Sequence, residues 1–452
     1  MRTTRAIIRS AVIGLAVLLG GTGPAQAAEP AAAVSRPNIV LCMTDDQGWG
    51  DVSYNGLKAI KTAALDDMAA NGLRFNRFYS AAPLCSPTRG SVLTGRHPNR
   101  YGCFTPGRPL KLQEKTLAQA VKSAGYATGH FGKWHLNGVS GPGKVIAGDD
   151  ALSPGKFGFD EWLSVSNYFD LDWTLSRRGT PEKFQGDGSE YIVGEALKFI
   201  SKAVEQKKPF LAVVWFGNPH NPHQALPEDQ KAAGGSAYYG EIVAIDRSMG
   251  KLRAGLRKLG VADDTLVWFC SDNGATGPGS TGGLRGKKGS VWEGGVRVPG
   301  IVEWPARIKK PATTDVPAVT SDIYPTVLDL LGLKVENPVE PLDGLSLVPL
   351  FDGQMKERPR PIGFWHYGGA RVKGGFGKDG GHAAWTDNRY KLHKLAPDRY
   401  ELYDLVTDPT EQKDVAGEKP EVVAKMKAAL DAWQESVVRS YKGEDYQPAG
   451  KP

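Results

Sequence analysis

Short runs of consecutive apolar residues alternate along the chain with segments in which apolar residues recur at helical spacing. The runs lie at residues 38–43 (NIVLCM), 126–131, 210–216 (FLAVVWF), 265–270 (TLVWFC) and 300–304. Unbroken apolar runs of this length are typical of strands that are buried on both faces of a sheet. The helical segments lie near residues 65–72, 115–124, 192–203, 242–256 and 321–331. This alternation predicts an α/β fold with a large mixed, mostly parallel sheet flanked by helices on both faces.

The pattern changes at residue 356. Short strand-like segments separated by turns follow at 362–367, 382–386, 389–394 and 400–404, and helical spacing covers 422–437. We expect an N-terminal domain over 28–355 and a small C-terminal subdomain over 356–452 that contains an antiparallel sheet and a helix. Residues 138–187 are rich in Gly, Asp, Ser and aromatic residues and are expected to be irregular.

Residues 1–27 have the three zones of a secretory signal peptide. Arg2, Arg5 and Arg9 form the charged start, and residues 11–19 are apolar but too few to cross a membrane. Ala25-Gln26-Ala27 fits the cleavage site. We therefore expect an exported protein, periplasmic or secreted, and no later stretch of the sequence is apolar for long enough to span a membrane.

The charge of the mature chain is mild. The formal net charge is +7 for the full sequence, and removal of residues 1–27, with three arginines and no acidic residue, lowers it to +4. The chain has no dense run of Lys and Arg, so nucleic-acid binding is not expected.

Four cysteines, at positions 42, 85, 103 and 270, are too few for a disulfide framework. Cys42 and Cys270 lie in apolar runs and are expected to be buried thiols, although an exported protein could form one disulfide.

Polar residues follow four of the predicted strands directly. They are Asp45 and Asp46, Lys133 and His135, His220, and Asp272 and Asn273. Ligands bind beyond the carboxyl ends of the strands in parallel sheets, so these side chains are expected to converge. Asp45, Asp46, Asp272 and Asn273 offer only oxygen ligands, which select Ca²⁺ or Mg²⁺ over Zn²⁺. An ordinary turn is the alternative for each cluster by itself, and two such clusters at two strand ends favour a metal site.

Residues 83–96 (PLCSPTRGSVLTGR) are the most distinctive stretch of the chain. Ser86 is a candidate N-cap, and Pro87 suits the first turn of a helix. Cys85 would then lie at a helix N-terminus, where free N–H groups and the helix dipole favour an anion. Arg89, one turn further along, can add a bidentate donor toward the same point. From these residues alone, a reactive side chain held against an oxyanion and a buried structural cysteine are about equally favoured.

Cys85, Pro87 and Arg89, followed by Leu-Thr-Gly-Arg at 93–96, resemble the motif of the type I sulfatases of the alkaline phosphatase superfamily. The resemblance continues through Gly-Lys-Trp-His at 132–135, His-Asn-Pro at 220–222, Lys-Gly-Ser-Val-Trp-Glu-Gly-Gly at 288–295, and residues 401–416. It therefore covers almost the whole mature chain. In that family the cysteine is oxidised after translation to formylglycine, an aldehyde whose hydrate is the nucleophile. The resemblance thus implies that Cys85 is a precursor and that a formylglycine-generating maturation enzyme is a partner.

The resemblance also implies a role for each polar cluster. One calcium ion would be bound by Asp45, Asp46, Asp272, Asn273, the formylglycine at position 85 and a sulfate oxygen. Lys133 and His135 would contact sulfate, and Arg89 would help the calcium to polarise the nucleophile. His220 or Lys288 would protonate the leaving alcohol, and His135 would be the base that restores the aldehyde. Lys287 directly precedes Lys288, which leaves that register open, and His223 is a further candidate for the substrate side.

These residues predict an exported sulfatase that hydrolyses sulfate monoesters, with sulfated poly- or oligosaccharides as the expected substrates. Two alternatives stay open: a phosphonate monoester or phosphodiester hydrolase of the same superfamily, and a non-catalytic glycan-binding relative. Substrate subsites are expected among aromatic and basic residues that include His97, Arg100, Arg177, Arg178, Trp365, His366 and His382.

Overall fold

The computed structural model describes residues 36–367 and 380–446, and both ranges belong to a unit that begins at Arg36. The expected signal peptide, residues 1–27, lies outside the described residues. Within these two ranges, every helix is too short or too polar to cross a lipid bilayer.

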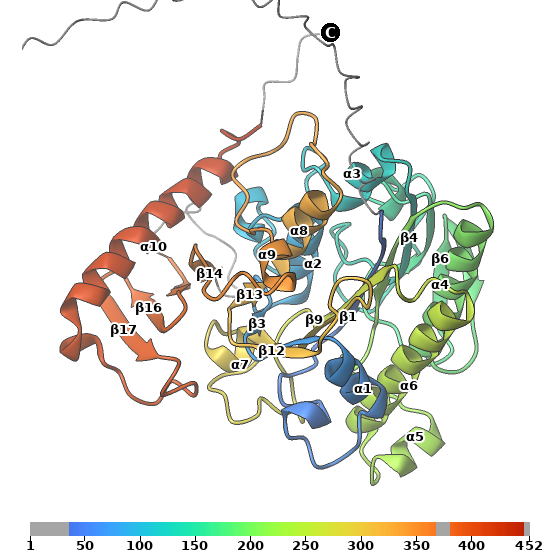
Figure 1. Cartoon of the computed structure of the whole chain (residues 1–452), viewed down its shortest axis with the longest axis horizontal. Coiled ribbons are helices and arrows are strands. Elements are labelled where there is room, and N and C mark those ends of the chain that lie inside the picture. The colour runs from blue at the N-terminus through green and yellow to red at the C-terminus, as the bar shows by residue number, and fades with distance from the viewer. Residues whose placement is uncertain (1–35, 368–379, 447–452) are drawn as a thin grey trace, which may run out of the picture. The chain divides into compact units, whose positions relative to one another are not determined.

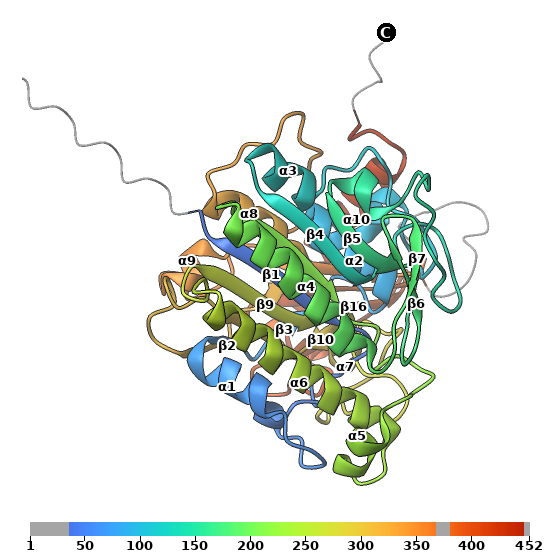
Figure 2. The same cartoon turned by 90° about the vertical axis from the view of Figure 1, so that its right-hand side faces the viewer.

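The described residues form a ten-stranded mixed sheet at the centre of this unit (Figures 1 and 2). Its order is β12 (Ala312–Thr314), β2 (Leu73–Phe75), β11 (Gly300–Glu303), β9 (Thr265–Ser271), β1 (Asn38–Thr44), β8 (Phe210–Trp215), β4 (Ala127–Lys133), β5 (Glu161–Val165), β6 (Thr174–Arg177) and β7 (Thr180–Lys183). The central strands from β9 to β5 are parallel neighbours. On the two sides of them, β11 and β6 pair in the antiparallel direction. The predicted mixed, mostly parallel sheet is thus confirmed, with a strand in each of the five apolar runs.

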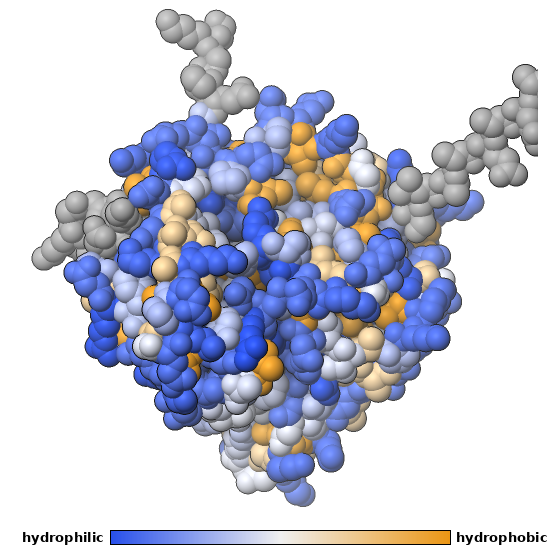
Figure 3. All heavy atoms as spheres, turned by 60° about the vertical axis from the view of Figure 1, so that its left-hand side comes forward, coloured by the Kyte–Doolittle hydropathy of each residue, from blue (hydrophilic) through white to orange (hydrophobic). Residues whose placement is uncertain are grey.

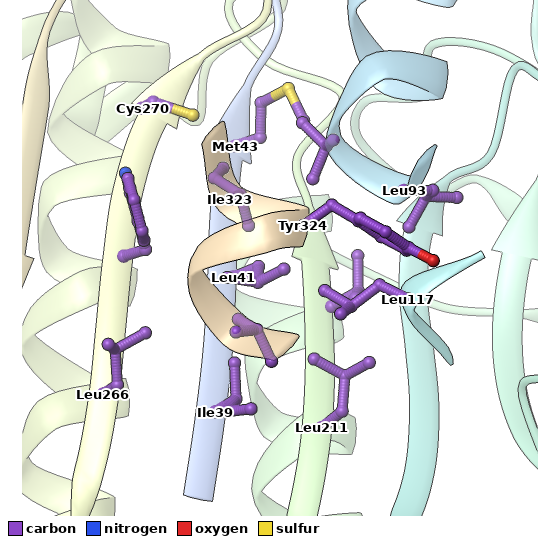
Figure 4. Close-up of a cluster of buried hydrophobic side chains, with 14 of the residues drawn as sticks. Ile39, Leu41, Met43, Leu93, Leu117, Leu211, Leu266, Cys270, Ile323 and Tyr324 are labelled. Atoms are coloured by element: carbon purple, nitrogen blue, oxygen red, sulfur yellow. The ribbon is translucent and has the colours of Figure 1, made fainter. Parts of the chain in front are cut away.

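Alternate residues of β1 face two hydrophobic clusters on opposite sides of the sheet. Ile39, Leu41 and Met43 share one cluster (Figure 4) with residues of α2 (Cys85–Thr94), α3 (Leu117–Ser123), α8 (Ile323–Leu330) and α9 (Val348–Phe351). Val40 and Cys42 share the other with residues of α1 (Ala63–Asn71), α4 (Gly188–Glu205) and α6 (Ala237–Lys258). Figure 2 shows α4 and α6 lying across that face of the sheet. Because successive side chains of a strand point to opposite faces, an unbroken apolar run needs cover on both sides, and the predicted helices provide it.

Residues 138–187 are more regular than the sequence indicated. β5 extends the central sheet, and β6 and β7 form a hairpin at its edge, so the expectation of an irregular segment was wrong for these strands. β6 (TLSR) and β7 (TPEK) are too short and polar to show an apolar run or a clear alternation. Arg178 and Gly179 at the hairpin turn have φ values of 50° and 100°. Two successive residues with positive φ are what a tight turn needs to match the twist of its strands.

Two smaller sheets complete the fold. β10 (Arg297–Val298), β3 (Phe78–Tyr79) and β13 (Ala318–Val319) form one, and short helices α5 (Pro227–Ala232) and α7 (Glu293–Val296) lie in the connections. The other is antiparallel and joins β14 (Ile362–His366), β15 (His382–Thr386), β16 (Tyr390–Ala396) and β17 (Arg399–Asp404) in sequence order. α10 (Pro420–Tyr441) shares a buried cluster with this sheet. The predicted C-terminal sheet and helix are confirmed, and the boundary between residues 355 and 356 stays a prediction.

Most large apolar side chains lie inside these clusters. The exposed ones in the described residues are scattered: Leu112, Val145, Val406 and Tyr441. Figure 3 shows one face of the molecule, on which hydrophilic residues predominate and hydrophobic residues occur in small groups. A surface of this kind is normal for a folded domain and gives no broad apolar contact area in this view.

Asp343 attaches α10 to the turn that follows α2. Its Oδ2 accepts hydrogen bonds from Arg100 Nε at 2.7 Å and from His97 N at 2.6 Å. Its Oδ1 accepts from Arg100 Nη2 at 2.9 Å and from Trp433 Nε1 of α10 at 2.8 Å. Arg100 also donates to Ser440 Oγ of α10 at 2.8 Å. One carboxylate therefore connects the C-terminal helix to the segment after Cys85.

Replacement of Asp343 by Asn should weaken this attachment. The amide keeps the shape but loses the charge that faces Arg100, whose side chain is 3% exposed. An uncompensated buried charge costs about 3–5 kcal/mol. We expect Asp343→Asn to lower the midpoint of urea unfolding, measured by tryptophan fluorescence. Asp352→Asn, in the more exposed Arg307–Asp352 pair, is the control and should cost less than about 1 kcal/mol. Equal shifts for the two variants would contradict the role of Asp343.

Candidate active site

The polar clusters meet beyond the carboxyl ends of β9, β1, β8 and β4, which are consecutive in the sheet. Asp45 and Asp46 follow β1, and Asp272 follows β9. Lys133 is the last residue of β4, and His220 lies in the loop after β8. Neighbouring parallel strands end at the same edge of a sheet, and this edge carries the site. The structure thus brings together the clusters that were expected to converge.

α2 begins at Cys85 and is buried along its whole length. Cys85 therefore lies at a helix N-terminus, and Pro87 lies in the first turn, as expected. Ser86 is not the N-cap, because Thr88 N donates to Leu84 O at 3.2 Å and the helix starts two residues earlier than predicted. Leu84 occupies the N-cap position in an extended conformation, and Ser86 Oγ accepts a hydrogen bond from Gly107 N at 3.3 Å. The first-turn N–H groups thus have no side-chain cap.

Arg89 and Lys133 neutralise the carboxylates of Asp45 and Asp272. Lys133 Nζ donates to Asp45 Oδ2 at 2.6 Å, and Arg89 donates to Asp272 Oδ2 from Nε at 3.1 Å and from Nη2 at 2.6 Å. All four side chains are fully buried. Burial favours the neutral form of Asp45, but the charges of Lys133, His220 and Arg89 hold its pKa below the usual value. Asp45 therefore stays ionised in a dry environment.

Asp46 contacts a second set of polar groups. Lys288 Nζ lies 2.7 Å from each of its carboxylate oxygens. Asn273 Nδ2 donates to Asp46 Oδ1 at 2.8 Å, and His220 Nε2 lies 3.8 Å from Oδ2. Lys287 instead donates to the carbonyl oxygen of Gly277 at 2.9 Å. The structure therefore decides the register that the sequence left open, and Lys288 faces the site.

The oxygen atoms of the site fit a hard divalent cation. Asp45 Oδ1 and Asn273 Oδ1 are buried and accept no hydrogen bond from any described residue. Single donor atoms of Asp45, Cys85 and Asp272 lie within 4.8 Å of one another, and so do those of Asp45, Asp46 and His220. A buried acceptor without a donor is costly, and a cation would satisfy it. Carboxylate and amide oxygens are the ligands that calcium and magnesium prefer.

His135 lies beside this cluster in a strained backbone conformation. Its φ is 53°, in the left-handed region that residues with a Cβ seldom adopt. The ring is buried, and within the described residues neither Nδ1 nor Nε2 has a hydrogen-bond partner. Burial, followed by the charges of Lys133 and Arg89, lowers the pKa of His135 well below its usual value. The ring is therefore neutral, and both of its nitrogens can contact a group bound at the site.

Three further residues at the site were missed in the sequence. Tyr168 stacks on His220 with 4.5 Å between ring centroids and 14° between planes. The Arg89 guanidinium lies 5.2 Å from the centroid of Trp215. Glu241, fully buried on α6, has Oε2 3.3 Å from His223 Nδ1. No local pattern marks these residues, because each reaches the site from a different segment. Only an alignment of related sequences could have indicated them.

Several residues expected to line substrate subsites have structural partners instead. Three of them are buried and have structural partners: His97, Arg100 and Trp365. Their aromatic or basic character serves packing and the attachment of α10, and a subsite role for them stays a prediction. Arg177 donates to the carboxylates of Glu182 and Glu195. The remaining candidates are at least partly exposed, and their role stays a prediction: Arg178, His366 and His382.

The four cysteines are free thiols, and all are buried. Cys42 and Cys270 lie on adjacent strands β1 and β9 and belong to opposite faces of the sheet. Burial raises the pKa of both thiols, so they are unreactive at neutral pH. The expectation of buried thiols at these positions is confirmed.

Comparison with known families identifies this arrangement. The family pattern described as Sulfatase matches residues 37–333, which is more than half of the chain and includes every polar site residue described above. The chain belongs to the sulfatase family. A second pattern, described as N-sulphoglucosamine sulphohydrolase, C-terminal, matches residues 286–436 of this sulfatase. The protein is therefore an enzyme, a sulfuric ester hydrolase, and the non-catalytic alternative is wrong.

Individual sulfatases resemble the chain over most of its length. The N-acetylgalactosamine-6-sulfatase of Canis lupus familiaris is 33% identical over 385 residues, which cover 76% of this chain and 70% of that protein. Arylsulfatase A of Homo sapiens is 31% identical over 466 residues, covering 88% and 89%. The crystal structure of Ps i-CgsB in complex with k-i-k-neocarrahexaose matches with a TM-score of 0.80 and 28% identity, covering 90% of this chain and 94% of that one. The resemblance to the sulfatases seen in the motifs is thus confirmed.

Replacement of Arg89 by Lys should impair this sulfatase although the positive charge is kept. Arg89 donates from three nitrogens, to Asp272 and to Lys133 O, and a lysine ammonium cannot reproduce that fork. We expect kcat for 4-nitrophenyl sulfate to fall by about 100-fold or more. Arg96→Lys is the matched control, because Arg96 is equally buried but pairs with Glu114 and Asp445. It should lower stability and leave kcat near the wild-type value, and equal losses of kcat in both variants would refute the assignment.

Proposed function

We propose that this sulfatase hydrolyses sulfate monoesters of carbohydrates, with a formylglycine at position 85 and one calcium ion. The observation that carries the proposal is the set of cations and unpaired imidazole nitrogens around Cys85, supplied by Arg89, Lys133, His135 and Lys288. A sulfate ester is an anion whose charge shifts toward the leaving oxygen during hydrolysis. Donors fixed in a water-excluded site stabilise such charge without reorganisation. The signal-peptide pattern of residues 1–27 supports action outside the cytoplasm.

Calcium is supported by the chemistry of the oxygen donors. Asp45, Asp46, Asp272 and Asn273 would hold the ion together with residue 85, and two of their oxygens accept no hydrogen bond from any described residue. When bound, the ion would supply positive charge next to the nucleophile and a sulfate oxygen. Arg89 and Lys133 orient the carboxylates of Asp272 and Asp45 for this purpose.

The environment of Cys85 supports its conversion to formylglycine. Burial raises the pKa of the thiol, although Lys133 and Lys288 oppose this effect. A buried neutral thiol is a weak nucleophile. The hydrate of formylglycine would instead supply a hydroxyl nucleophile at the N-terminus of α2. Because Cys85 is only 1% exposed, the maturation enzyme would have to act before this part of the chain folds.

Different side chains around residue 85 can serve as the base and as the proton donor of the reaction. His135 is neutral and has an unpaired ring nitrogen, as a base that accepts a proton requires. Lys288 is a charged donor: burial lowers its pKa, but Asp46, Cys85 and Asp45 together raise it above the usual value. His220 lies at the more open side, with its side chain 14% exposed. Lys288 and His220 are thus the groups that can deliver a proton to the leaving oxygen.

A carbohydrate substrate is supported by the similar proteins. The Ps i-CgsB structure contains a neocarrahexaose, and the canine relative is named for N-acetylgalactosamine 6-sulfate chemistry. A panel of sulfated oligosaccharides, with released sulfate measured by ion chromatography, tests this class. An aryl phosphonate monoester belongs in the same panel, because faster turnover of that compound would favour the phosphonate hydrolase alternative.

The Cys85→Ser variant should be nearly inactive, because a serine cannot become an aldehyde hydrate by this maturation. The peptide that contains residue 85, isolated from the native host, should be about 18 Da lighter than the cysteine form by covalent bookkeeping. Mass spectrometry and turnover of 4-nitrophenyl sulfate measure the two results. Normal multiple turnover by Cys85→Ser, or by wild-type protein with a plain thiol at position 85, would exclude the formylglycine proposal.

Asp45→Asn should remove calcium from the site. The substitution keeps one oxygen but deletes the charge that faces Lys133, and a lost carboxylate ligand weakens calcium binding. We expect the purified variant to retain much less than one calcium per chain by elemental analysis, with activity reduced in parallel. Asp246→Asn is the matched control, because Asp246 is also buried but accepts hydrogen bonds from the first turn of α1. A wild-type protein without any divalent ion would defeat the proposal.

A further inference from the structure

Two buried carboxyl groups beside the active site have no part in the chemistry proposed above. Asp170 lies in the segment that carries Tyr168, and Glu241 lies on α6; their exposed fractions are 3% and 0%. Their side chains form a hydrogen bond with each other. An ionised carboxylate can only accept, so two carboxyl groups can share a hydrogen bond only if one of them is protonated. The pair therefore holds at least one proton.

Glu241 is the acceptor of this pair, because both of its oxygens already face nitrogen atoms. Oε1 accepts from Gln224 N at 2.5 Å, and Oε2 lies 3.3 Å from His223 Nδ1. Asp170 Oδ1 is buried and has no hydrogen-bond partner among the described residues. Burial raises the pKa of both groups, and the hydrogen bond between them raises the pKa of Asp170 further while it lowers that of Glu241. Asp170 is thus the group that carries the proton.

The pair connects two segments that meet at His220. Glu241 holds residues 223 and 224, which follow His220 in the same loop. Asp170 is two residues from Tyr168, whose ring stacks on His220 at 4.5 Å. A shift of either segment would therefore change how His220 lies against Asp46.

His223 is also held on its other side. Its ring meets Tyr238 edge-on, with 5.1 Å between centroids, and Tyr238 donates to Asp51 Oδ2 at 2.5 Å. Asp51 accepts in turn from Gly48 N at 2.9 Å, in the loop that follows Asp46. The loop that carries His220 is thus fixed between α6 and the loop that carries the metal-site carboxylates.

We propose that Asp170 and Glu241 are positioning residues for sulfate ester hydrolysis. Asp170 donates its proton to Glu241, and ionised Glu241 fixes His223 with hydrogen on Nδ1 and holds the His220 loop in register with Tyr168. Like charges on both groups would drive the two segments apart, whereas the shared proton joins them. Hydrogen-bond partners behind site residues orient those residues and commonly affect activity by about 10- to 100-fold. The inference rests on the proposed function for its kinetic measurement.

The test compares variants that keep or remove each hydrogen-bonding role. Glu241→Gln replaces an acceptor oxygen by an NH₂ group that faces donors, and we expect kcat for 4-nitrophenyl sulfate to fall by about 10- to 100-fold with a smaller change in KM. Asp170→Asn keeps a donor and should lose much less activity than Asp170→Leu, which has similar shape but no donor. Asp246→Asn is the matched control and should leave kcat near the wild-type value. Asp246 also lies buried on α6, but it accepts hydrogen bonds from Ala64 N and Leu65 N in the first turn of α1.

Wild-type kcat in Glu241→Gln, or equal losses in Asp170→Asn and Asp170→Leu, would overturn the proposal. If Glu241→Gln does not fold, the two Asp170 variants still decide it. ¹⁵N NMR of labelled histidine gives a measurement that does not depend on turnover. The wild-type protein should show His223 with its hydrogen on Nδ1, and a hydrogen on Nε2 instead would count against the proposal. Failure of wild-type protein to hydrolyse any sulfate ester would refute the proposed function, and the NMR result would still test the pair.

Discussion

The pairing of buried carboxylates with buried cations is the constraint on which the active site depends. Asp45, Asp46 and Asp272 are fully buried, and each would be costly to ionise without a partner. Their partners come from other elements: Arg89 from α2, Lys133 from the end of β4, and Lys288 from the loop after β9. A stable charge balance therefore exists only when helix, strand and loop are correctly assembled. The same ion pairs that offset the cost of burying these carboxylates also place Cys85 beside them.

The central sheet provides the rigid base for this cluster. β9, β1, β8 and β4 are parallel and consecutive, and both faces are covered by helices, so their ends are held at fixed spacing. The polar side chains of the site occupy the strand ends and the loops just beyond them, where irregular backbone is tolerated. Asp46 and His135 both adopt positive φ at these ends. Such strain is stable only where the surrounding packing enforces it, and the sheet supplies that packing.

Two levels of support thus surround the reacting residues. The first consists of the charge pairs just described, and the second of groups that hold whole loops, such as Glu241 on α6 and Asp343 beneath α10. Asp343 shows how far the second level extends, because it connects the C-terminal helix to the turn that follows the Cys85 helix. The sulfatase site is therefore an assembly of segments distant in sequence, and its geometry is a property of the whole unit.

The parts of the fold that were predictable had strong local patterns. The runs in β1, β8 and β9 are apolar without interruption, and apolar residues recur at helical spacing along most of α4 and α6. The spacing of apolar residues was therefore enough to predict these elements. β6 and β7 are short and polar at an edge of the sheet, and tertiary pairing rather than pattern makes them strands. Ser86 was predicted to be the N-cap because serine is common at that position. The actual start of α2 depends on which backbone N–H groups find partners in the surrounding chain. His97 and Arg100 have the composition of a binding surface and are buried by α10, which no local pattern reveals.

The sequence by itself determined the residue types of the site and the order of its elements. Carboxylates and an amide after two strands indicated a cluster of the oxygen ligands that hard cations prefer, and the cysteine motif indicated the sulfatases, because chemistry and motif are local properties. Only the tertiary structure decided that Lys288 rather than Lys287 faces Asp46, that His135 has no partner on either ring nitrogen, and that Tyr168 and Glu241 support the His220 loop. Those results depend on distances between segments far apart in the chain. Such distances are set by how the sheet, helices and loops pack, which no single stretch of sequence encodes.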